Sequence, residues 1–94
     1  DYAAALECYD HCIALQPTNP VAQANRAMAL IKLGQLREAM ETCELGLQLS
    51  GPSQIKEKLN YRLQLAQTLL QRETQNINVA INEVTMLPAE FERL

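Results

Sequence analysis

The sequence repeats itself at an offset of 34 residues near its start, and this repeat constrains the fold more than any other feature. Within each copy, large apolar residues and alanines recur at i, i+3 and i+7, which places them on one face of an amphipathic helix. Repeats of about this length are typical of stacked helical hairpins. The matched pairs are Tyr2 and Leu36, Ala5 and Ala39, Leu6 and Met40, Tyr9 and Cys43, Ile13 and Leu47, and Leu15 and Leu49.

Helix-breaking residues divide the chain into four helical segments. Asn19 suits an N-cap and Pro20 suits the first helical turn, so a helix is expected to start there. Gly34 and Gly51 follow apolar stripes, where glycine commonly ends a helix, and Ser53 can cap the last segment. The predicted helices cover residues 2–15, 20–33, 36–49 and 54–72.

Short turns between these segments make neighbouring helices antiparallel. Residues 2–15 are interpreted as the second helix of a repeat, residues 19–49 as a complete repeat, and residues 54–72 as a capping helix. We therefore predict an all-α array of helical hairpins over residues 1–73 and an extended C-terminal tail over residues 74–94.

The first helix of the first repeat is not in this sequence. We therefore expect the apolar face formed by Leu6, Tyr9 and Ile13 to be exposed to water on one side. This arrangement leads us to interpret the chain as an N-terminally shortened form of a longer one.

Composition excludes several classes of function. The net charge is −3 and aromatic residues make up 4% of the chain, so we expect no nucleic-acid binding. No apolar run is long enough for a membrane span. His11 is the only histidine, and neither a phosphate loop nor a nucleophile motif occurs, so we expect no enzyme, cofactor or metal. Cys8, Cys12 and Cys43 form no disulfide framework, which suggests the cytoplasm and nucleus. Cys12 and Cys43 are predicted to be packing residues.

The segment ANRAMALIKLG (24–34), followed by Ala39 and Cys43, resembles the tetratricopeptide-repeat (TPR) cochaperones that bind heat-shock proteins. The resemblance is greatest to a subfamily of small fungal TPR proteins associated with heat-shock protein 90. It runs through YDHCIALQPTNPV (9–21) and KLNYRLQLAQ (58–67) and continues into NEVTMLPAEFER (82–93).

This resemblance implies a cochaperone adaptor. Such proteins clamp the acidic C-terminal peptide of heat-shock protein 90, Met-Glu-Glu-Val-Asp with its free carboxylate. They also hold a partner that contains a PIH domain. Together with RuvB-like ATPases they assemble small nucleolar ribonucleoproteins and large kinases.

The family clamp uses five polar side chains, and three have matches here: Asn25, Lys58 and Arg62. Lys58 and Arg62 are four residues apart, which puts both on one helix face. The other two clamp residues, a lysine and an asparagine, belong to the helix that this sequence lacks, so we expect this chain to bind the peptide poorly. Arg26 is a possible contact for the acidic side chains of the ligand. The alternatives are that the three clamp residues are ordinary solvated groups and that Arg26 is solvated or bridges repeats.

The predicted tail contains a strand-like alternation. The resemblance implies that this segment adds to the β-sandwich of the PIH-domain partner. The alternatives are a disordered tail and a tail that folds back over the exposed repeat face. The predicted partner-binding residues are Ile77, Val79, Ile81, Val84, Leu87 and Phe91.

A second hypothesis for the whole chain is a TPR interaction module without chaperone binding. In that case the module would form the end of a larger scaffold or the targeting arm of an enzyme. This hypothesis predicts that the natural chain continues past Leu94 with another domain.

Overall fold

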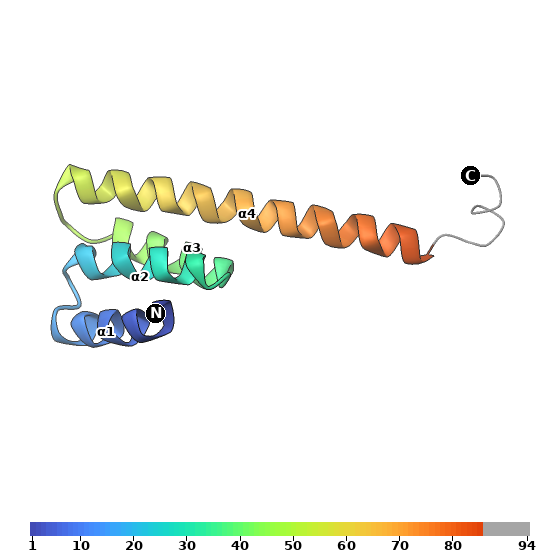
Figure 1. Ribbon diagram of the computed structural model, residues 1–94. Coiled ribbons are helices and arrows are strands. Elements are labelled where there is room, and N and C mark those ends of the chain that lie inside the picture. Colours follow the sequence, from blue (N-terminus) through green and yellow to red (C-terminus); the bar gives the residue numbers. More distant parts are fainter. Residues whose placement is uncertain (86–94) are drawn as a thin grey trace.

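The computed structural model describes the backbone of residues 1–85 and the side chains of residues 1–76. Four helices make up most of it (Figure 1). No strand occurs among residues 1–85, so the predicted all-α array is confirmed over this range. The helices are α1 (Tyr2–Leu15), α2 (Pro20–Lys32), α3 (Leu36–Leu47) and α4 (Ser53–Thr85).

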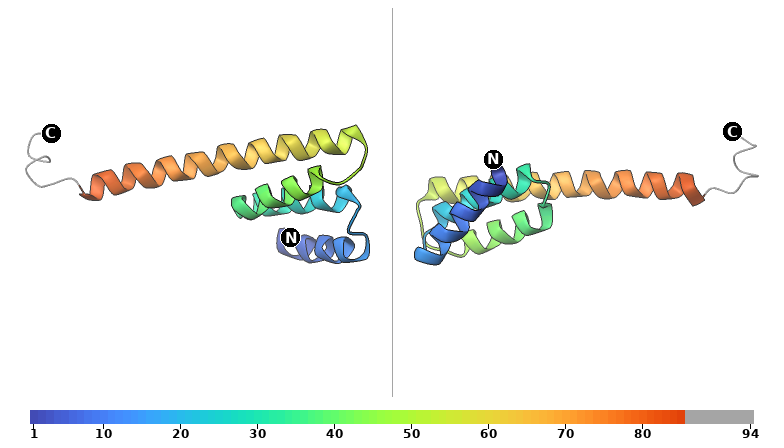
Figure 2. Two further views of the ribbon diagram at one scale, coloured as in Figure 1. Left: turned by 180° about the vertical axis from the view of Figure 1, so that it is seen from behind. Right: turned by 60° about the horizontal axis from the view of Figure 1, so that its bottom comes forward.

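Helix α2 lies at the centre of the array and contacts the other three helices, and α3 also packs against α4. Consecutive helices run antiparallel, as their short connections require (Figure 1, Figure 2). The first half of α4 covers the α2–α3 hairpin, and its second half projects beyond the hairpin (Figure 2).

The ends of α2 are fixed by local chemistry that the sequence predicts. The Asn19 side chain accepts a hydrogen bond from the Val21 amide at 3.0 Å, and Pro20 occupies the first helical turn. At the other end Gly34 has a φ of +78°, which residues with a side chain rarely adopt. Its amide and the next one donate to the Ile31 and Leu30 carbonyls at 3.0 and 2.9 Å, which forms a Schellman motif.

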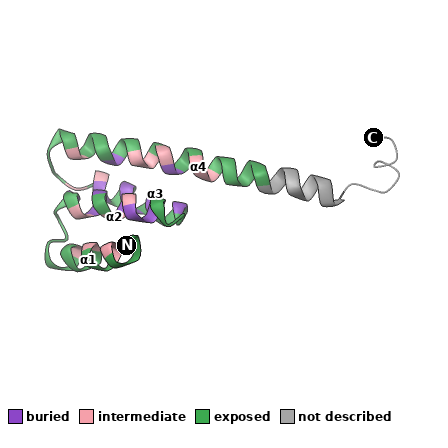
Figure 3. Cartoon of the chain, viewed as in Figure 1, coloured by how far each residue is buried: buried purple, intermediate pink, exposed green. Residues whose placement is uncertain are grey.

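The core fills the space between α2, α3 and the first half of α4 (Figure 3). Gly46 allows α3 and α4 to approach closely, because a Cβ there would lie 2.9 Å from both methyl carbons of Leu59. Two clusters of buried residues make up this core: Leu30, Ile31, Leu36, Ala39 and Ala66 in one, and Ala24, Ala27, Cys43 and Leu59 in the other.

Helix α1 is the least buried of the helices that pack into the array. None of its residues is buried, although Leu6 contacts the core. Tyr9 and Ile13 remain partly exposed, as the sequence predicts.

The predicted end of the last helix at residue 72 and the extended conformation predicted from residue 74 are wrong up to residue 85, whereas the domain boundary at residue 73 stays a prediction. Helix α4 continues without interruption to Thr85, so Ile77, Val79, Ile81 and Val84 lie on a helix. The spacing of positions 77, 81 and 84 also fits a helix, and short apolar runs often fit both periods. No glycine or proline occurs between residues 53 and 87, and extending an existing helix needs no new nucleus. Residues 86–94, with Leu87 and Phe91, lie outside the described residues.

No described helix combines the length and the apolar character needed to cross a membrane.

Candidate functional site

A hollow of about 420 Å³ lies between α2 and the first turns of α4. Lys58 and Arg62 project from successive turns of α4, and Met28 comes from α2. The hollow is lined by Met28, Gln54, Glu57, Lys58, Tyr61 and Arg62.

A second hollow, of about 250 Å³, adjoins the first. The two share Met28 and Arg62, and the second adds Asn25 from α2 together with residues of α1. We call the two hollows together the Arg62 groove. The second hollow is lined by Asp1, Tyr2, Ala5, Tyr9, Asn25, Met28, Ala29 and Arg62.

The structure therefore brings the three predicted clamp residues into adjoining space. Arg62 shares one hollow with Lys58 and the other with Asn25, whereas Asn25 and Lys58 share neither. Asn25 and Lys58 are exposed, and Arg62 is half-buried.

The Arg62 side chain forms a hydrogen bond to the backbone of the neighbouring helix α2. Its Nη1 donates to the carbonyl oxygen of Ala24 at 2.6 Å. Ala24 lies in the core of α2 with 2% of its surface exposed, and it directly precedes Asn25. The guanidinium therefore lies at the floor of the groove, against α2.

The positive charges of the groove are not neutralised within the described part of the chain. Among residues 1–76, no carboxylate comes within 4.0 Å of Lys58 or Arg62. Glu57 lines the same hollow but forms no ion pair with any side chain of residues 1–76. Two cations four residues apart on a helix repel each other by a few tenths of a kcal/mol, so an anion in the groove would be favoured.

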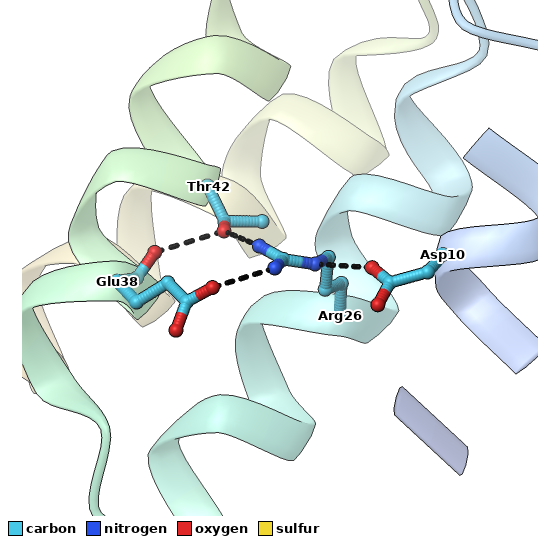
Figure 4. Close-up of polar contacts among 4 residues, drawn as sticks. All are labelled: Asp10, Arg26, Glu38 and Thr42. Atoms are coloured by element: carbon cyan, nitrogen blue, oxygen red, sulfur yellow. Dashed lines mark hydrogen bonds and ion pairs between the residues drawn. The ribbon is translucent and has the colours of Figure 1, made fainter. Parts of the chain in front are cut away.

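Arg26 has a different environment. It lies on the side of α2 that faces α1 and α3 (Figure 4). Its Nε pairs with Asp10 at 2.7 Å, its Nη2 pairs with Glu38 at 2.7 Å, and its Nη1 donates to the Thr42 hydroxyl. Thr42 in turn donates to the Glu38 carbonyl oxygen at 2.8 Å.

These contacts identify Arg26 as a residue that bridges repeats. Burial alone would lower its pKa, but the hydrogen bonds to Asp10 and Glu38 outweigh burial and raise the pKa. Three of its five N–H donors are engaged in these contacts, and the predicted contact between Arg26 and a peptide ligand stays a prediction.

The three cysteines divide into one buried thiol and two exposed ones. Cys43 lies in the core as predicted, and burial raises the pKa of its thiol to about 11, although the nearby positive charge of Arg62 opposes this shift. Cys12 is exposed, so its predicted packing role is wrong, and Cys8 is exposed as well. No cluster of potential metal ligands occurs among the described residues.

Sequence reasoning missed the uncharged walls of the groove. Tyr61 and Gln54 lie three and four residues from Lys58, and Met28 lies three residues from Asn25. The spacing rule that pairs Lys58 with Arg62 would have found all three.

Comparison with known proteins supports the tetratricopeptide-repeat part of the resemblance, whereas the narrower resemblance to a fungal subfamily associated with heat-shock protein 90 stays a prediction. The model of the tetratricopeptide repeat family matches residues 1–59. The chain is 48% identical over 44 residues to small glutamine-rich tetratricopeptide repeat-containing protein beta from Homo sapiens, which covers 47% of this chain and 14% of that protein. It is 36% identical over 67 residues to sperm-associated antigen 1 from Mus musculus, which covers 71% of this chain and 7% of that protein.

A third relative is the TPR repeat-containing thioredoxin TTL4 from Arabidopsis thaliana, at 49% identity over 43 residues. That alignment covers 46% of this chain and 6% of the relative. The chain thus spans only a small part of the length of each of these three proteins.

Proposed function

Because the chain belongs to the tetratricopeptide-repeat family, whose domains mediate protein–protein interaction, we propose that its Arg62 groove binds an acidic peptide with a free C-terminal carboxylate. The specific ligand is the C-terminal Met-Glu-Glu-Val-Asp peptide of heat-shock protein 90. The protein then acts as a cochaperone adaptor.

The observation that carries this proposal is the pair of uncompensated cations in one hollow. Lys58 and Arg62 line it without a carboxylate partner among residues 1–76, in a chain whose net charge is −3. Lysine offers a point charge, and arginine offers a planar fork that fits a carboxylate. The Asn25 amide, in the adjoining hollow, can donate one more hydrogen bond.

The adaptor role requires a second binding surface, which we place on the C-terminal segment. The family resemblance suggests a PIH-domain protein as its partner, and RuvB-like ATPases as indirect partners. The complex would act in the cytoplasm and nucleus, in the assembly of protein and ribonucleoprotein complexes. Because α4 carries residues 77–85 as a helix, the partner would meet a helix there before any extended segment.

The test is a calorimetric titration of Met-Glu-Glu-Val-Asp into two proteins. One is this chain, and the other carries one additional N-terminal helix with the remaining lysine and asparagine of the clamp. A hydrogen bond to a charged group contributes about 1.5–3 kcal/mol, so losing two of them removes about 3–6 kcal/mol from a micromolar affinity of about 8 kcal/mol. We expect the extended protein to bind, and this chain to bind far more weakly.

Two controls make the titration specific. The same peptide with a C-terminal amide in place of the carboxylate should bind the extended protein much more weakly. Lys58→Ala should weaken binding of the free acid by the extended protein by about 1.5–3 kcal/mol. If neither protein binds the free acid, then Asn25, Lys58 and Arg62 are ordinary surface residues and the clamp proposal is wrong.

That negative outcome would favour the second hypothesis, a TPR interaction module of a larger protein. One observation favours this hypothesis: in each of the three relatives, the matched segment makes up only 6–14% of a much longer protein.

A further inference from the structure

We propose that Arg62 is a positioning residue as well as a ligand of the peptide: its bond to the Ala24 carbonyl fixes the guanidinium plane, so that the free edge of the fork is already oriented for a carboxylate. This inference rests on the proposed function, because it assigns a mechanism to the same groove.

The first step of the argument is the position of the anchor. In a regular helix the Ala24 carbonyl accepts the amide of Met28, so the Arg62 Nη1 at 2.6 Å is an additional donor to the same oxygen. The turn from Ala24 to Met28 also carries Asn25, and both Asn25 and Met28 line the groove. The bond thus connects α4 to the turn of α2 that faces the ligand.

The second step is the geometry of the side chain. Arginine carries five N–H donors in a rigid plane, so one bond at Nη1 restricts the direction of all the others. Nε and Nη2 stay free of carboxylates among residues 1–76, and the residue lines both hollows. A lysine at this position would keep the charge, but as a point charge on a flexible stem it would offer neither a fixed plane nor a bidentate edge.

The third step is burial. Arg62 is half-buried, whereas Lys58, one turn earlier on α4, is exposed. The guanidinium reaches from α4 to the buried Ala24 of α2, where its Nη1 donates to the carbonyl oxygen at 2.6 Å. The side chain is therefore ordered before any ligand arrives, which lowers the entropy cost of binding.

The experiment compares Arg62→Lys, which keeps the charge, with Lys58→Gln, which removes an exposed charge that makes no hydrogen bond or ion pair among residues 1–76. In the 94-residue chain without peptide, Arg62→Lys should lower the Tm by about 4–8 °C. It should also speed hydrogen exchange of the Met28 amide. Lys58→Gln should change neither the Tm nor the exchange rate of the Met28 amide.

The binding arm uses the N-terminally extended protein and Met-Glu-Glu-Val-Asp as free acid and as amide. Arg62→Lys should weaken binding of the acid by about tenfold or more and should reduce the preference for acid over amide. Loss of stability alone would not change that preference at a temperature where the variant is folded.

Three outcomes overturn the inference. Unchanged exchange in Arg62→Lys means that the Ala24 bond does not hold the turn. Faster exchange with unchanged acid preference means that Arg62 is only structural, and the clamp then rests on Lys58 and Asn25. If the wild-type extended protein binds no peptide, the proposed function is wrong, and so is the claim that Arg62 orients a ligand. The exchange measurement would still show whether the bond from Arg62 to the Ala24 carbonyl stabilises the turn of α2.

Discussion

Arg26 and Arg62 lie on the neighbouring helices α2 and α4, and they differ in their charged partners among residues 1–76. Arg26 forms ion pairs with Asp10 and Glu38, and through these pairs and its bond to Thr42 it connects α1, α2 and α3 (Figure 4). Arg62 makes one bond to a neutral carbonyl and keeps its charge uncompensated among residues 1–76. The difference teaches that the environment of a cation, rather than its presence, distinguishes a structural residue from a candidate binding residue.

The largest effect is expected from a substitution in the hydrophobic core, because the helices that carry both arginines pack around it. Leu59 is fully buried and packs at Gly46, between α3 and α4. Leu59→Ala should cost about 2–5 kcal/mol of unfolding free energy, from lost transfer energy and the cavity left behind. Urea unfolding measures the change. Leu45→Ala, at a position that is 56% exposed, should stay within about 0.5 kcal/mol of wild type.

The next largest effect separates binding from stability at the groove. Lys58→Ala should reduce the binding energy of the extended protein for Met-Glu-Glu-Val-Asp by about 1.5–3 kcal/mol, the usual contribution of a charge-assisted hydrogen bond. Its unfolding free energy should change by no more than about 0.5 kcal/mol, because the side chain is exposed. Calorimetry and urea unfolding on the same preparation give both values. Equal losses of affinity and stability would contradict the assignment of Lys58 to the ligand.

The pH dependence of stability offers a test of the position of Arg62, because the positive charge of Arg62 lowers the pKa of the Cys43 thiol. Its pKa of about 11 in the folded protein is above the ordinary value of 9.0. The folded state therefore keeps a proton that the unfolded state loses, and stability falls as pH rises from about 9 to about 11, by at most about 1.4 kcal/mol per pH unit.

Two variants should move this pH dependence in defined directions. Cys43→Ala should remove it. Arg62→Gln should raise the pKa of Cys43 further, because the opposing positive charge is gone. Arg26→Gln is the matched control and should leave the pKa of Cys43 unchanged. Unfolding followed at several pH values decides the matter, and an equal shift in both glutamine variants would count against the position assigned to Arg62.

The smallest effect is expected at the Arg26 bridge. Its two carboxylate partners are about half exposed, so solvent screens both ion pairs. Arg26→Met should cost about 0.5–1 kcal/mol of unfolding free energy and should leave the peptide affinity of the folded extended protein unchanged. Urea unfolding and calorimetry test the two halves. A loss of affinity with retained stability would indicate that Arg26 contacts the peptide.

The features predictable from sequence are those with local causes. The start of α2 at Asn19 and Pro20 and its end at Gly34 follow from the chemistry of a few consecutive residues. The placement of Lys58 and Arg62 in one hollow follows from their spacing on a helix.

Features that depend on how helices cross could not be predicted in this way. The bonds from Arg26 to Asp10 and from Arg62 to Ala24 join residues 16 and 38 positions apart, and no local pattern marks them. The proximity of Asn25 to Arg62 was expected only through the family resemblance. The helix from residue 74 to 85 was missed because its apolar spacing fits two periods, and continuation from α4 decided between them.

The length of α4 makes it a molecular ruler. At about 1.5 Å per residue, Thr85 lies about 35 Å along the helix axis from Arg62. The proposed partner-binding surface at the end of α4 would thus lie at a defined distance from the groove, and also at a defined angle, because each residue rotates the helix by about 100°. Deleting one residue near position 75 would redirect that surface sharply while shortening the ruler by only about 1.5 Å. Inserting seven residues would lengthen it by two turns and nearly restore the direction, so an adaptor that depends on direction would tolerate the longer change better than the shorter one.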